Sequence, residues 1–314
     1  MPIPGSLLDY DAEAEAYDAT RGGAPRAEAA AAAVLDLVPT RARTLLDLGC
    51  GTGIVTARLR RPGLRVLGAD ASYGMAAMAA RRGIPVVIAS GTALPVRSRS
   101  LDAVSAVWLL HLLREPGVVP RLIAEVARTL RPGGVFVTTV DKDAAHDVGS
   151  DVDEVLAPHL TSTPADASAQ VTAYAAEAGL RPCGEALFTG LGQGVTPRGA
   201  AEALRAGRYA SRVVPGGAIV EEVATRLGAL PEQDVPRADP TYRLAAFARD
   251  WRRTGGGPEA DRRRRTGGDE RAGTEGRGRE GRVRRVPAAT TGPGSRCPRT
   301  GGPAPPRPPP AGAR

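Results

Sequence analysis

Apolar and polar positions alternate in a regular order between residues 44 and 140, where short apolar runs are separated by longer segments with helical spacing. The apolar runs predict β-strands at residues 44–48, 65–69, 85–88, 103–108 and 135–140. The segments between and before them predict helices at residues 25–38, 54–60, 72–82 and 118–130. This alternation indicates parallel strands joined by right-handed crossovers, with ligands bound beyond the carboxyl ends of the strands.

After residue 140 the pattern changes. A helix at 165–178, a strand at 182–189, two helices at 197–206 and 218–230 and a last strand at 242–248 are expected there.

The first strand runs directly into three glycines at alternate positions, Gly49, Gly51 and Gly53. Glycine takes positive φ freely and leaves no Cβ between its amide and a ligand, and the helix expected after the loop would present unpaired N–H groups to an anion. A dinucleotide fingerprint would place its third glycine one residue later, where this chain has Ile54. We expect a ligand-binding loop in which Cys50 is a small apolar filler.

With Asp47 in front, the loop reads D-x-G-x-G-x-G and resembles the first motif of class I S-adenosylmethionine-dependent methyltransferases, in particular the small-molecule enzymes of the type 11, ubiquinone and menaquinone group. This resemblance covers roughly two hundred residues. It implies S-adenosylmethionine as the cofactor and a Rossmann-like α/β fold, with a seven-stranded mostly parallel sheet, an antiparallel edge hairpin and helices on both faces. It also implies a set of cofactor contacts, at Asp47, Gly49, Cys50, Gly51, Gly53, Asp70, Ala71, Ser90, Gly91, Thr92 and Trp108.

Asp70 ends the second predicted strand. A carboxylate there can accept two hydrogen bonds from the vicinal hydroxyls of a ribose, each contributing about 1.5–3 kcal/mol when shielded from water. The alternatives are a cap for the following helix or a surface acid.

Ser90-Gly91-Thr92-Ala93-Leu94-Pro95 resembles the family's G-D-A-x-x-L-P passage, whose Asp contacts the adenine amino group. Ser90 stands at that Asp position, so adenine recognition would fall to the Ser90 hydroxyl, the Gly91 and Thr92 amides, or water. Ser90 and Thr92 could equally be ordinary turn residues.

The fourth strand leads into Trp108 and His111, and the Arg131-Pro132-Gly133-Gly134 turn precedes the fifth strand as in the family's last sheet motif. Proline and glycine there would end the preceding helix. If the acceptor is a hydroxyl, His111 is the candidate catalytic base; the alternative is a structural imidazole in the pocket floor. Trp108 would line the pocket or pack in the core.

Tyr17 and Arg21 belong to a Y-D-x-x-R element ahead of the first helix. Many small-molecule methyltransferases fold a similar element over the cofactor, so Tyr17 and Arg21 are candidate cofactor contacts, with the guanidinium near the cofactor's carboxylate. Alternatively, Tyr17 packs on the core and Arg21 faces solvent.

Composition divides the chain at about residue 251. Residues 252–314 hold 16 arginines against 6 acidic residues and contain 14 Gly and 10 Pro, but no Leu, Ile, Met or aromatic residue. They have no apolar surface to offset chain entropy, so we expect a disordered tail of charge +10 after a methyltransferase domain at 1–251 with a charge of −2. Within that domain, residues 193–240 are expected as a helical insertion over the acceptor pocket.

The tail could bind nucleic acid through counterion release, but it lacks aromatic residues for base stacking, so a nucleic-acid partner is not expected. A read-through or frame-altered end is an open alternative for it. The three cysteines are too scattered for a disulfide framework or a zinc site, no metal is expected, and no apolar stretch of membrane-spanning length occurs. We therefore expect a cytoplasmic protein without a membrane segment.

Three functions remain open at this point. The first is methyl transfer to a small-molecule acceptor, such as a quinone or polyketide-like metabolite. A nicotinamide oxidoreductase would explain the glycine loop and the terminal acid but not the spacing of the third glycine. A non-catalytic binder of adenosylmethionine or nucleic acid is the third, encouraged by Ser90 and the basic tail.

Overall fold

The computed structural model describes residue 18 and residues 22–160, 164–207 and 217–250. Within them, seven strands form one sheet in the order β3-β2-β1-β4-β5-β7-β6. The first five strands pair in parallel, and β7 lies antiparallel between β5 and β6. The predicted Rossmann-like sheet with its antiparallel edge pair is therefore confirmed. The strands are β1 (Thr44–Leu48), β2 (Arg65–Asp70), β3 (Val86–Ile88), β4 (Leu101–Ala106), β5 (Leu130–Val140), β6 (Leu180–Thr189) and β7 (Thr241–Arg249).

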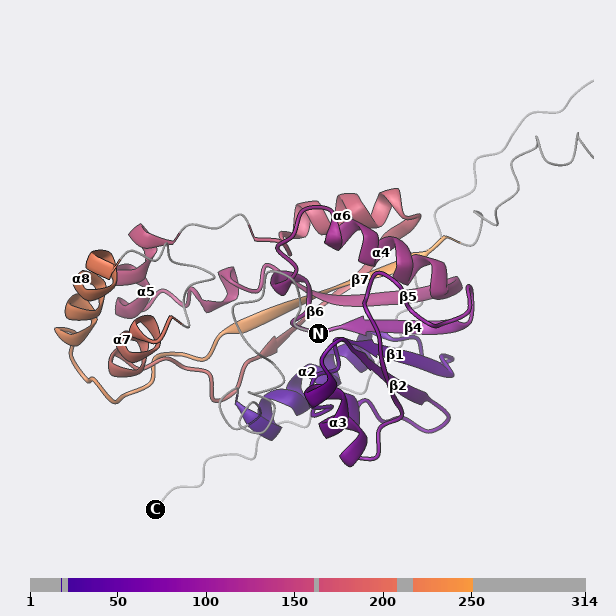
Figure 1. Cartoon of the computed structure of the whole chain (residues 1–314), viewed down its shortest axis with the longest axis horizontal. Coiled ribbons are helices and arrows are strands. Elements are labelled where there is room, and N and C mark those ends of the chain that lie inside the picture. Colours follow the sequence, from indigo (N-terminus) through magenta and orange to yellow (C-terminus); the bar gives the residue numbers. More distant parts are fainter. Residues whose placement is uncertain (1–17, 19–21, 161–163, 208–216, 251–314) are drawn as a thin grey trace, which may run out of the picture. The chain divides into compact units, whose positions relative to one another are not determined.

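Helices cover both faces of this sheet (Figure 1). On one face, α4 and α6 pack on strand residues such as Leu46, Val104 and Phe136. On the other face, α2 packs on Leu45 and Tyr242 among others. These two hydrophobic cores pack on the two faces of the sheet. The carboxyl ends of the parallel strands are therefore held in fixed positions along one edge. The α-helices are α2 (Gly23–Leu37), α3 (Tyr73–Arg81), α4 (Val118–Thr129), α5 (Asp151–Leu156), α6 (Ser168–Glu177), α7 (Pro197–Arg205) and α8 (Gly217–Gly228).

The helix predicted at 54–60 is the main error in the secondary-structure prediction. Only a single 3-10 turn, η1 (Thr56–Arg58), forms there. Three β-branched residues in a row, 54–56, lower the helix propensity, and Pro62 disfavours the helical conformation of the residue before it. The glycine loop is therefore not followed by an α-helix whose terminus could bind an anion.

The Arg131–Gly134 segment also differs from its prediction. Helix α4 ends at Thr129, Leu130 is already extended, and β5 begins there. Gly133 has a φ of +75°, and the pairing of β4 with β5 shifts register between Leu101 and Ala103. These glycines therefore shape an irregularity at the start of β5 and do not cap the helix.

Three helices outside the sheet layers share a small core of their own. Apolar residues of α5, α7 and α8 are buried against one another. Helix α5 was not predicted; it begins at a capping box in which Ser150 and Asp153 bond reciprocally. The insertion at 193–240 thus does contain two helices, α7 and α8, as predicted.

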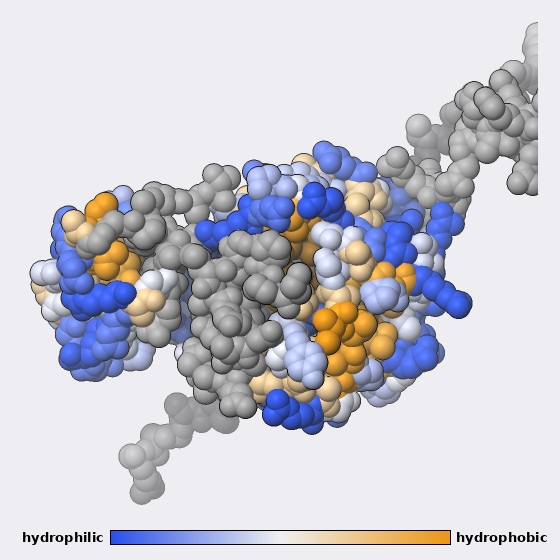
Figure 2. Space-filling view, viewed as in Figure 1, coloured by the Kyte–Doolittle hydropathy of each residue, from blue (hydrophilic) through white to orange (hydrophobic). Residues whose placement is uncertain are grey.

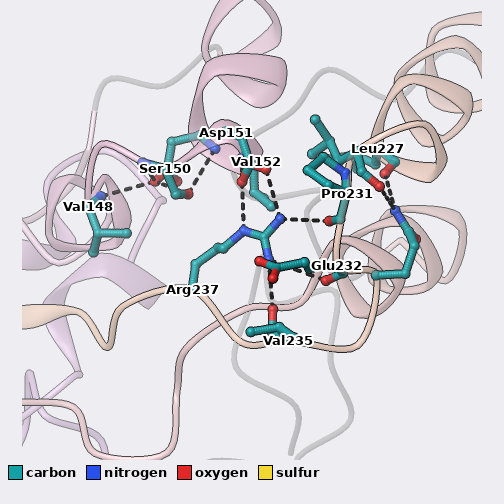
Figure 3. Close-up of polar contacts among 12 residues, drawn as sticks. Val148, Ser150, Asp151, Val152, Leu227, Pro231, Glu232, Val235 and Arg237 are labelled. Atoms are coloured by element: carbon teal, nitrogen blue, oxygen red, sulfur yellow. Dashed lines mark hydrogen bonds and ion pairs between the residues drawn. The ribbon is translucent and has the colours of Figure 1, made fainter.

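Arg237 holds the segment after α8 against the start of α5 (Figure 3). Its guanidinium donates to both carboxylate oxygens of Asp151, each at 2.7 Å. It also donates to three backbone carbonyls, those of Pro231 (3.0 Å), Glu232 (3.3 Å) and Val235 (2.8 Å). A planar group with five donors suits this arrangement better than lysine would.

Asp166, a buried residue just before α6, connects that segment to the residues that follow β5. The backbone oxygen of Asp166 accepts from the Asp141 N–H (2.9 Å), and its Oδ2 accepts from the Lys142 N–H (2.9 Å). Asp166 is 1% exposed, and among the described residues its Oδ1 has no hydrogen-bond partner. Burial raises the pKa of this carboxyl group to about 6, and the charge of Asp143 acts in the same direction.

We predict that Asp166→Asn becomes more stabilising, relative to the wild type, as pH rises. Between about pH 4 and 6 the unfolded chain loses the Asp166 proton while the folded chain keeps it, so the wild-type free energy of unfolding falls by about 3 kcal/mol and then levels off. Asparagine does not titrate, so the free energy of unfolding of the Asp166→Asn variant does not fall in this way. Urea unfolding of both proteins at about pH 4.5 and 7.5 measures the difference, and a pH-independent difference would contradict the prediction.

Asp151→Asn provides the control with the opposite sign. The Arg237 guanidinium holds the pKa of Asp151 below its ordinary value, so this carboxylate stabilises the fold above that value and loses its contribution as pH falls. The Asp151 variant should therefore lose stability relative to wild type at the higher pH.

Hydrophilic residues cover most of the visible surface of the described part, and an apolar area lies near β2 and α3 (Figure 2). Exposed apolar side chains in these elements and in β3 include Leu67, Tyr73 and Ile88. None of the helices in the described ranges is both long and apolar enough to cross a membrane. The same part of the chain contains no cluster of His, Cys, Asp and Glu suited to a metal ion.

Candidate functional site

A cavity of about 540 Å³ opens beyond the carboxyl ends of β1, β2, β3 and β4. This is the edge at which α/β sheets bind their ligands, as predicted. Ten of the predicted cofactor contacts line it, namely Asp47, Gly49, Cys50, Gly51, Asp70, Ala71, Ser90, Gly91, Thr92 and Trp108. Tyr17 and Arg21 lie outside the described residues.

The glycine loop approaches the cavity through one glycine in particular. Gly49, Gly51 and Gly53 all have positive φ, at +68°, +55° and +78°. A Cβ on Gly51 would meet no atom within 4 Å among the described residues, whereas a Cβ on Gly49 would lie 2.8 Å from the Leu109 side chain. Gly51 is therefore the glycine that leaves open space on the cavity side.

Gly53 has a different role from the one predicted. It does not line the cavity, and its missing Cβ points at α3 and the loop after it, 2.6 Å from the Ile84 side chain and 3.1 Å from Ala79 Cα. The third glycine therefore allows the loop to pack closely on α3. Its place in the motif gave no way to distinguish packing from ligand contact.

Asp70 lies at the tip of β2, 8% exposed, at the cavity wall. Its Oδ2 accepts from the Gly51 N–H (2.8 Å) and its Oδ1 from the Ser72 N–H (2.9 Å). Ser72, and not Asp70, caps α3, because its hydroxyl accepts from the Met75 N–H. The capping alternative for Asp70 is thus removed.

Asp47 is a buried carboxylate at the base of the loop. It accepts from the hydroxyls of Thr56 (2.6 Å) and Ser105 (2.7 Å), which ties β1 to η1 and β4. Burial raises its pKa to about 6, although both hydroxyls oppose the shift. Burial also raises the pKa of the neighbouring Cys50 thiol, which favours its protonated form.

The segment after β3 forms the wall at the other end of the cavity. The hydroxyls of Ser90 and Thr92 lie 3.0 Å apart, and the Thr92 N–H donates weakly to Ser90 Oγ (3.3 Å). A Cβ on Gly91 would lie 2.8 Å from Leu122, so the turn packs closely on α4. Glu115, which was not predicted, also lines this cavity.

Trp108 and Arg26 form a further wall. Trp108 follows β4 with a φ of +53°, a conformation that is costly for a residue with a Cβ. Its ring packs edge-on against Phe188 and Tyr242, and the Arg26 guanidinium carbon lies 4.0 Å from the ring centroid. Trp108 therefore lines the pocket and also packs in the core, so the two predicted alternatives hold together.

Arg26 is a cavity residue that the sequence analysis does not predict. It is 8% exposed, comes from α2 and lines the cavity. The available signal was its position, because Arg26, Ala30 and Val34 share one helix face and both partners are completely buried. A charged residue on an otherwise apolar face indicates a buried cation at a ligand site or in an ion pair.

His111 lies on η2 (Leu110–Leu112) and does not line the main cavity. It lines a second cavity of about 310 Å³, between the loop before α4 and the start of α6. Leu113 and Glu115 line both cavities, so the two cavities lie next to each other. No described residue of the 193–240 insertion lines either of these two cavities, and its predicted place over the acceptor stays a prediction.

Comparison with known proteins agrees with this geometry. Residues 46–138 match the family model described as "Methyltransferase domain". A demethylmenaquinone methyltransferase of Corynebacterium kroppenstedtii is 35% identical over 98 residues, 31% of this chain and 42% of the relative. A methyltransferase of Mycobacterium tuberculosis without an assigned substrate is 43% identical over 101 residues, 31% of this chain and 40% of the relative. The chain thus matches about two fifths of the length of these relatives.

Two further similarities are to a tRNA-modifying enzyme and to a solved structure of similar fold. A tRNA (carboxymethyluridine(34)-5-O)-methyltransferase of Arabidopsis thaliana is 30% identical over 132 residues, 42% of this chain and 31% of the relative. The solved structure of the [4+2]-cyclase SpnF has a TM-score of 0.50 at 20% identity, covering 77% of this chain and 93% of that one. The second similarity concerns the fold alone.

Residues 46–138 match a methyltransferase domain, and the matched relatives together with the sheet order support a class I S-adenosylmethionine-dependent methyltransferase. The family match includes the glycine loop, Asp70 and the Ser90 turn, which are three of the segments that line the cavity. The identification favours adenosylmethionine over the nicotinamide cofactor that the glycine loop alone also allowed.

Proposed function

We propose that this protein transfers a methyl group from S-adenosylmethionine to a small-molecule acceptor. One observation carries the proposal: the cavity at the carboxyl edge of the sheet places the open side of Gly51 and the Asp70 carboxylate on the same wall. The other site residues fit the rest of the cofactor.

The cavity wall matches the three parts of adenosylmethionine. Asp70 offers hydrogen-bond acceptors for the ribose hydroxyls, and the loop at Gly51 leaves room for the methionine moiety. The polar turn Ser90–Thr92 faces the cavity together with apolar side chains such as Leu122, a suitable combination for an adenine ring. Arg26, whose guanidinium carbon lies 4.0 Å from the Trp108 ring centroid, suits a carboxylate.

When bound, adenosylmethionine supplies an electrophilic methyl group on a sulfonium. In the transfer the bond from sulfur to the methyl carbon breaks, a bond from the acceptor atom to that carbon forms, and the acceptor loses a proton if it carries one. The protein's own contribution is orientation and exclusion of water, and alignment can account for about 7–11 kcal/mol of the barrier. The strands fix the Asp70 and glycine-loop walls that would orient the donor.

The acceptor class follows from charge and wall chemistry. The relatives act, by their names, on demethylmenaquinone and on a tRNA. Residues 1–251 have a net charge of −2, which does not favour a polyanion, and the cavity wall around Leu109, Leu112 and Val118 is apolar. These observations support a small, largely apolar acceptor over a nucleic acid.

Calorimetric titration of the full chain tests the cofactor, and transfer of a labelled methyl group tests the reaction. Adenosylmethionine and adenosylhomocysteine should bind and NADH should not. Label should then pass to a demethylated quinone and not to tRNA. Binding of NADH alone would reject the proposal, and label in tRNA would reject the small-molecule acceptor.

A second candidate function is non-catalytic binding or a different reaction on the same fold. The similarity in fold to a [4+2]-cyclase supports keeping it, because a fold does not determine the reaction. Tight adenosylmethionine binding without transfer to any extract component would favour this candidate.

The tail and the location complete the proposal. We place the active unit in residues 1–251, treat 252–314 as dispensable for it, and expect a cytoplasmic protein. Equal turnover of the full chain and of a chain ending at 251 would support this division, and loss of turnover in the shorter chain would reject it.

His111 remains the candidate base, on the condition that a hydroxyl acceptor occupies the second cavity. We predict that His111→Ala lowers turnover about 10²–10⁴-fold while leaving adenosylmethionine affinity unchanged, because the residue lines only the neighbouring cavity. His159→Ala, on η4 (Ala157–His159), is the control and should keep wild-type turnover. Near-normal turnover of the His111 variant would leave the imidazole a structural role.

A further inference from the structure

Asp18, Thr52 and Arg82 form a closed set of contacts behind the glycine loop. The Thr52 hydroxyl donates to Asp18 Oδ1 at 2.6 Å. The Arg82 guanidinium donates to Asp18 Oδ2 with one nitrogen and to the Thr52 backbone carbonyl with another. Three segments far apart in the sequence therefore meet at one residue of the loop.

Thr52 is the residue between the second and third glycines, and it lines the main cavity while being 1% exposed. Both its hydroxyl and its carbonyl are used by the set. The preceding residue, Gly51, is held separately, because the Asp70 carboxylate accepts a hydrogen bond from its N–H. The loop is thus held by one carboxylate from β2 and by a second from the segment before α2.

The ion pair differs from an ordinary surface pair. The side chain of Asp18 is 18% exposed and that of Arg82 is 32% exposed, and Arg82 is the C-cap residue of α3. Isolated exposed pairs contribute little, whereas a network with fixed geometry and partial burial contributes more. Arg82 therefore connects a helix of the sheet layer to the loop through two acceptors.

A loop with three glycines has many backbone conformations in the absence of such contacts. Ligand affinity is reduced by the entropy lost when a binding loop becomes ordered, and contacts that order the loop beforehand remove that loss. We infer that Asp18 is a positioning residue for the cofactor: with Arg82 it fixes Thr52, and so holds the open side of the neighbouring Gly51 ready for adenosylmethionine. This inference rests on the proposed function.

The inference places a determinant of cofactor affinity in a residue that need not touch the cofactor. It also separates Asp18 from its neighbours Tyr17 and Arg21, which the sequence favours as direct contacts. The two roles predict different results, because a direct contact is lost independently of Arg82, whereas the positioning effect of Asp18 depends on Arg82 and Thr52.

The test is a double-mutant cycle on adenosylmethionine affinity, measured by calorimetry with the full chain. Asp18→Ala and Arg82→Ala should each raise the Kd about tenfold, and the double variant should be no weaker than either single variant. Arg81→Ala, an exposed arginine one residue earlier, is the matched control and should keep the wild-type Kd. Thr52→Val should resemble Asp18→Ala, because it removes the shared hydroxyl.

Asp18→Asn keeps the measurement informative if Asp18→Ala fails to fold. Asparagine can still accept from Thr52 but loses the charge opposite Arg82, so its Kd should lie between those of wild type and Asp18→Ala. In a transfer assay, the KM for adenosylmethionine should rise while kcat changes little, whereas a merely structural role would lower the melting temperature and leave KM unchanged.

Wild-type binding with an unchanged Kd in the Asp18 and Arg82 variants would overturn the positioning role alone. Additive losses in the double variant would do the same. Failure of the wild type to bind adenosylmethionine would overturn the proposed function and this inference together.

Discussion

Gly51→Ala should weaken adenosylmethionine binding at least tenfold while leaving the fold nearly intact. Gly53→Ala should instead lower the stability of the fold and affect adenosylmethionine binding less. At Gly51, with φ at +55°, alanine costs about 1–2 kcal/mol of backbone strain, but its methyl group has open space and would occupy the cavity side of the loop. At Gly53 the same strain is joined by a clash with Ile84 and the backbone of Ala79. Overpacking of this kind adds about 1–3 kcal/mol.

Urea unfolding and calorimetric titration of both variants separate the two effects. Gly149→Ala is the control for backbone strain alone, because Gly149 has a φ of +71° with no atom near its missing Cβ among the described residues. The Gly51 variant should match it in stability and the Gly53 variant should be clearly less stable. Equal loss of affinity in both loop variants, at equal stability, would contradict the division of roles.

Asp70→Ala should raise the Kd for adenosylmethionine by about one to two orders of magnitude, corresponding to about 1.5–3 kcal/mol. The loss combines the ribose hydrogen bonds with the acceptor that holds the Gly51 N–H. The fold should persist, because Ser72 and not Asp70 caps α3.

Adenosylhomocysteine lacking the ribose hydroxyls isolates the ribose contribution. Wild type should bind this analogue much more weakly than adenosylhomocysteine, whereas Asp70→Ala should discriminate little between the two. Asp47→Asn is the matched control, because its carboxylate is engaged by Thr56 and Ser105, and it should discriminate like wild type. If Asp70→Ala discriminated fully, Asp70 would not contact the ribose.

The sheet and most of the cavity wall were predictable because they depend on local signals. Strands 44–48 and 65–70 are apolar runs that end at polar or glycine residues, and the carboxyl ends of neighbouring parallel strands meet at one edge. Asp70 was placed at the cavity from its position at a strand end, and the Ser90 turn was placed there through the family resemblance. The family resemblance supplied the order of the motifs.

The details that the sequence could not place depend on tertiary contacts that no local pattern shows. Gly53 has the same dihedral requirement as Gly51, and only the approach of α3 distinguishes packing from ligand contact. His111 follows β4 as predicted, but the 3-10 turn η2 directs residues 109 and 112 to the main cavity and His111 to its neighbour. Arg26 lies about twenty residues before the loop, so no motif linked them.

The position of β7 has a consequence for how this protein is made. Among the described strands, β6 pairs with β7 alone, which lies between it and β5, and Arg249 at the end of β7 donates to the Leu130 carbonyl at 2.7 Å. During synthesis on the ribosome, β5 and β6 must therefore wait with open edges until residue 249 has emerged. Open edges invite pairing with other chains, so a nascent chain arrested before that residue would be prone to aggregate.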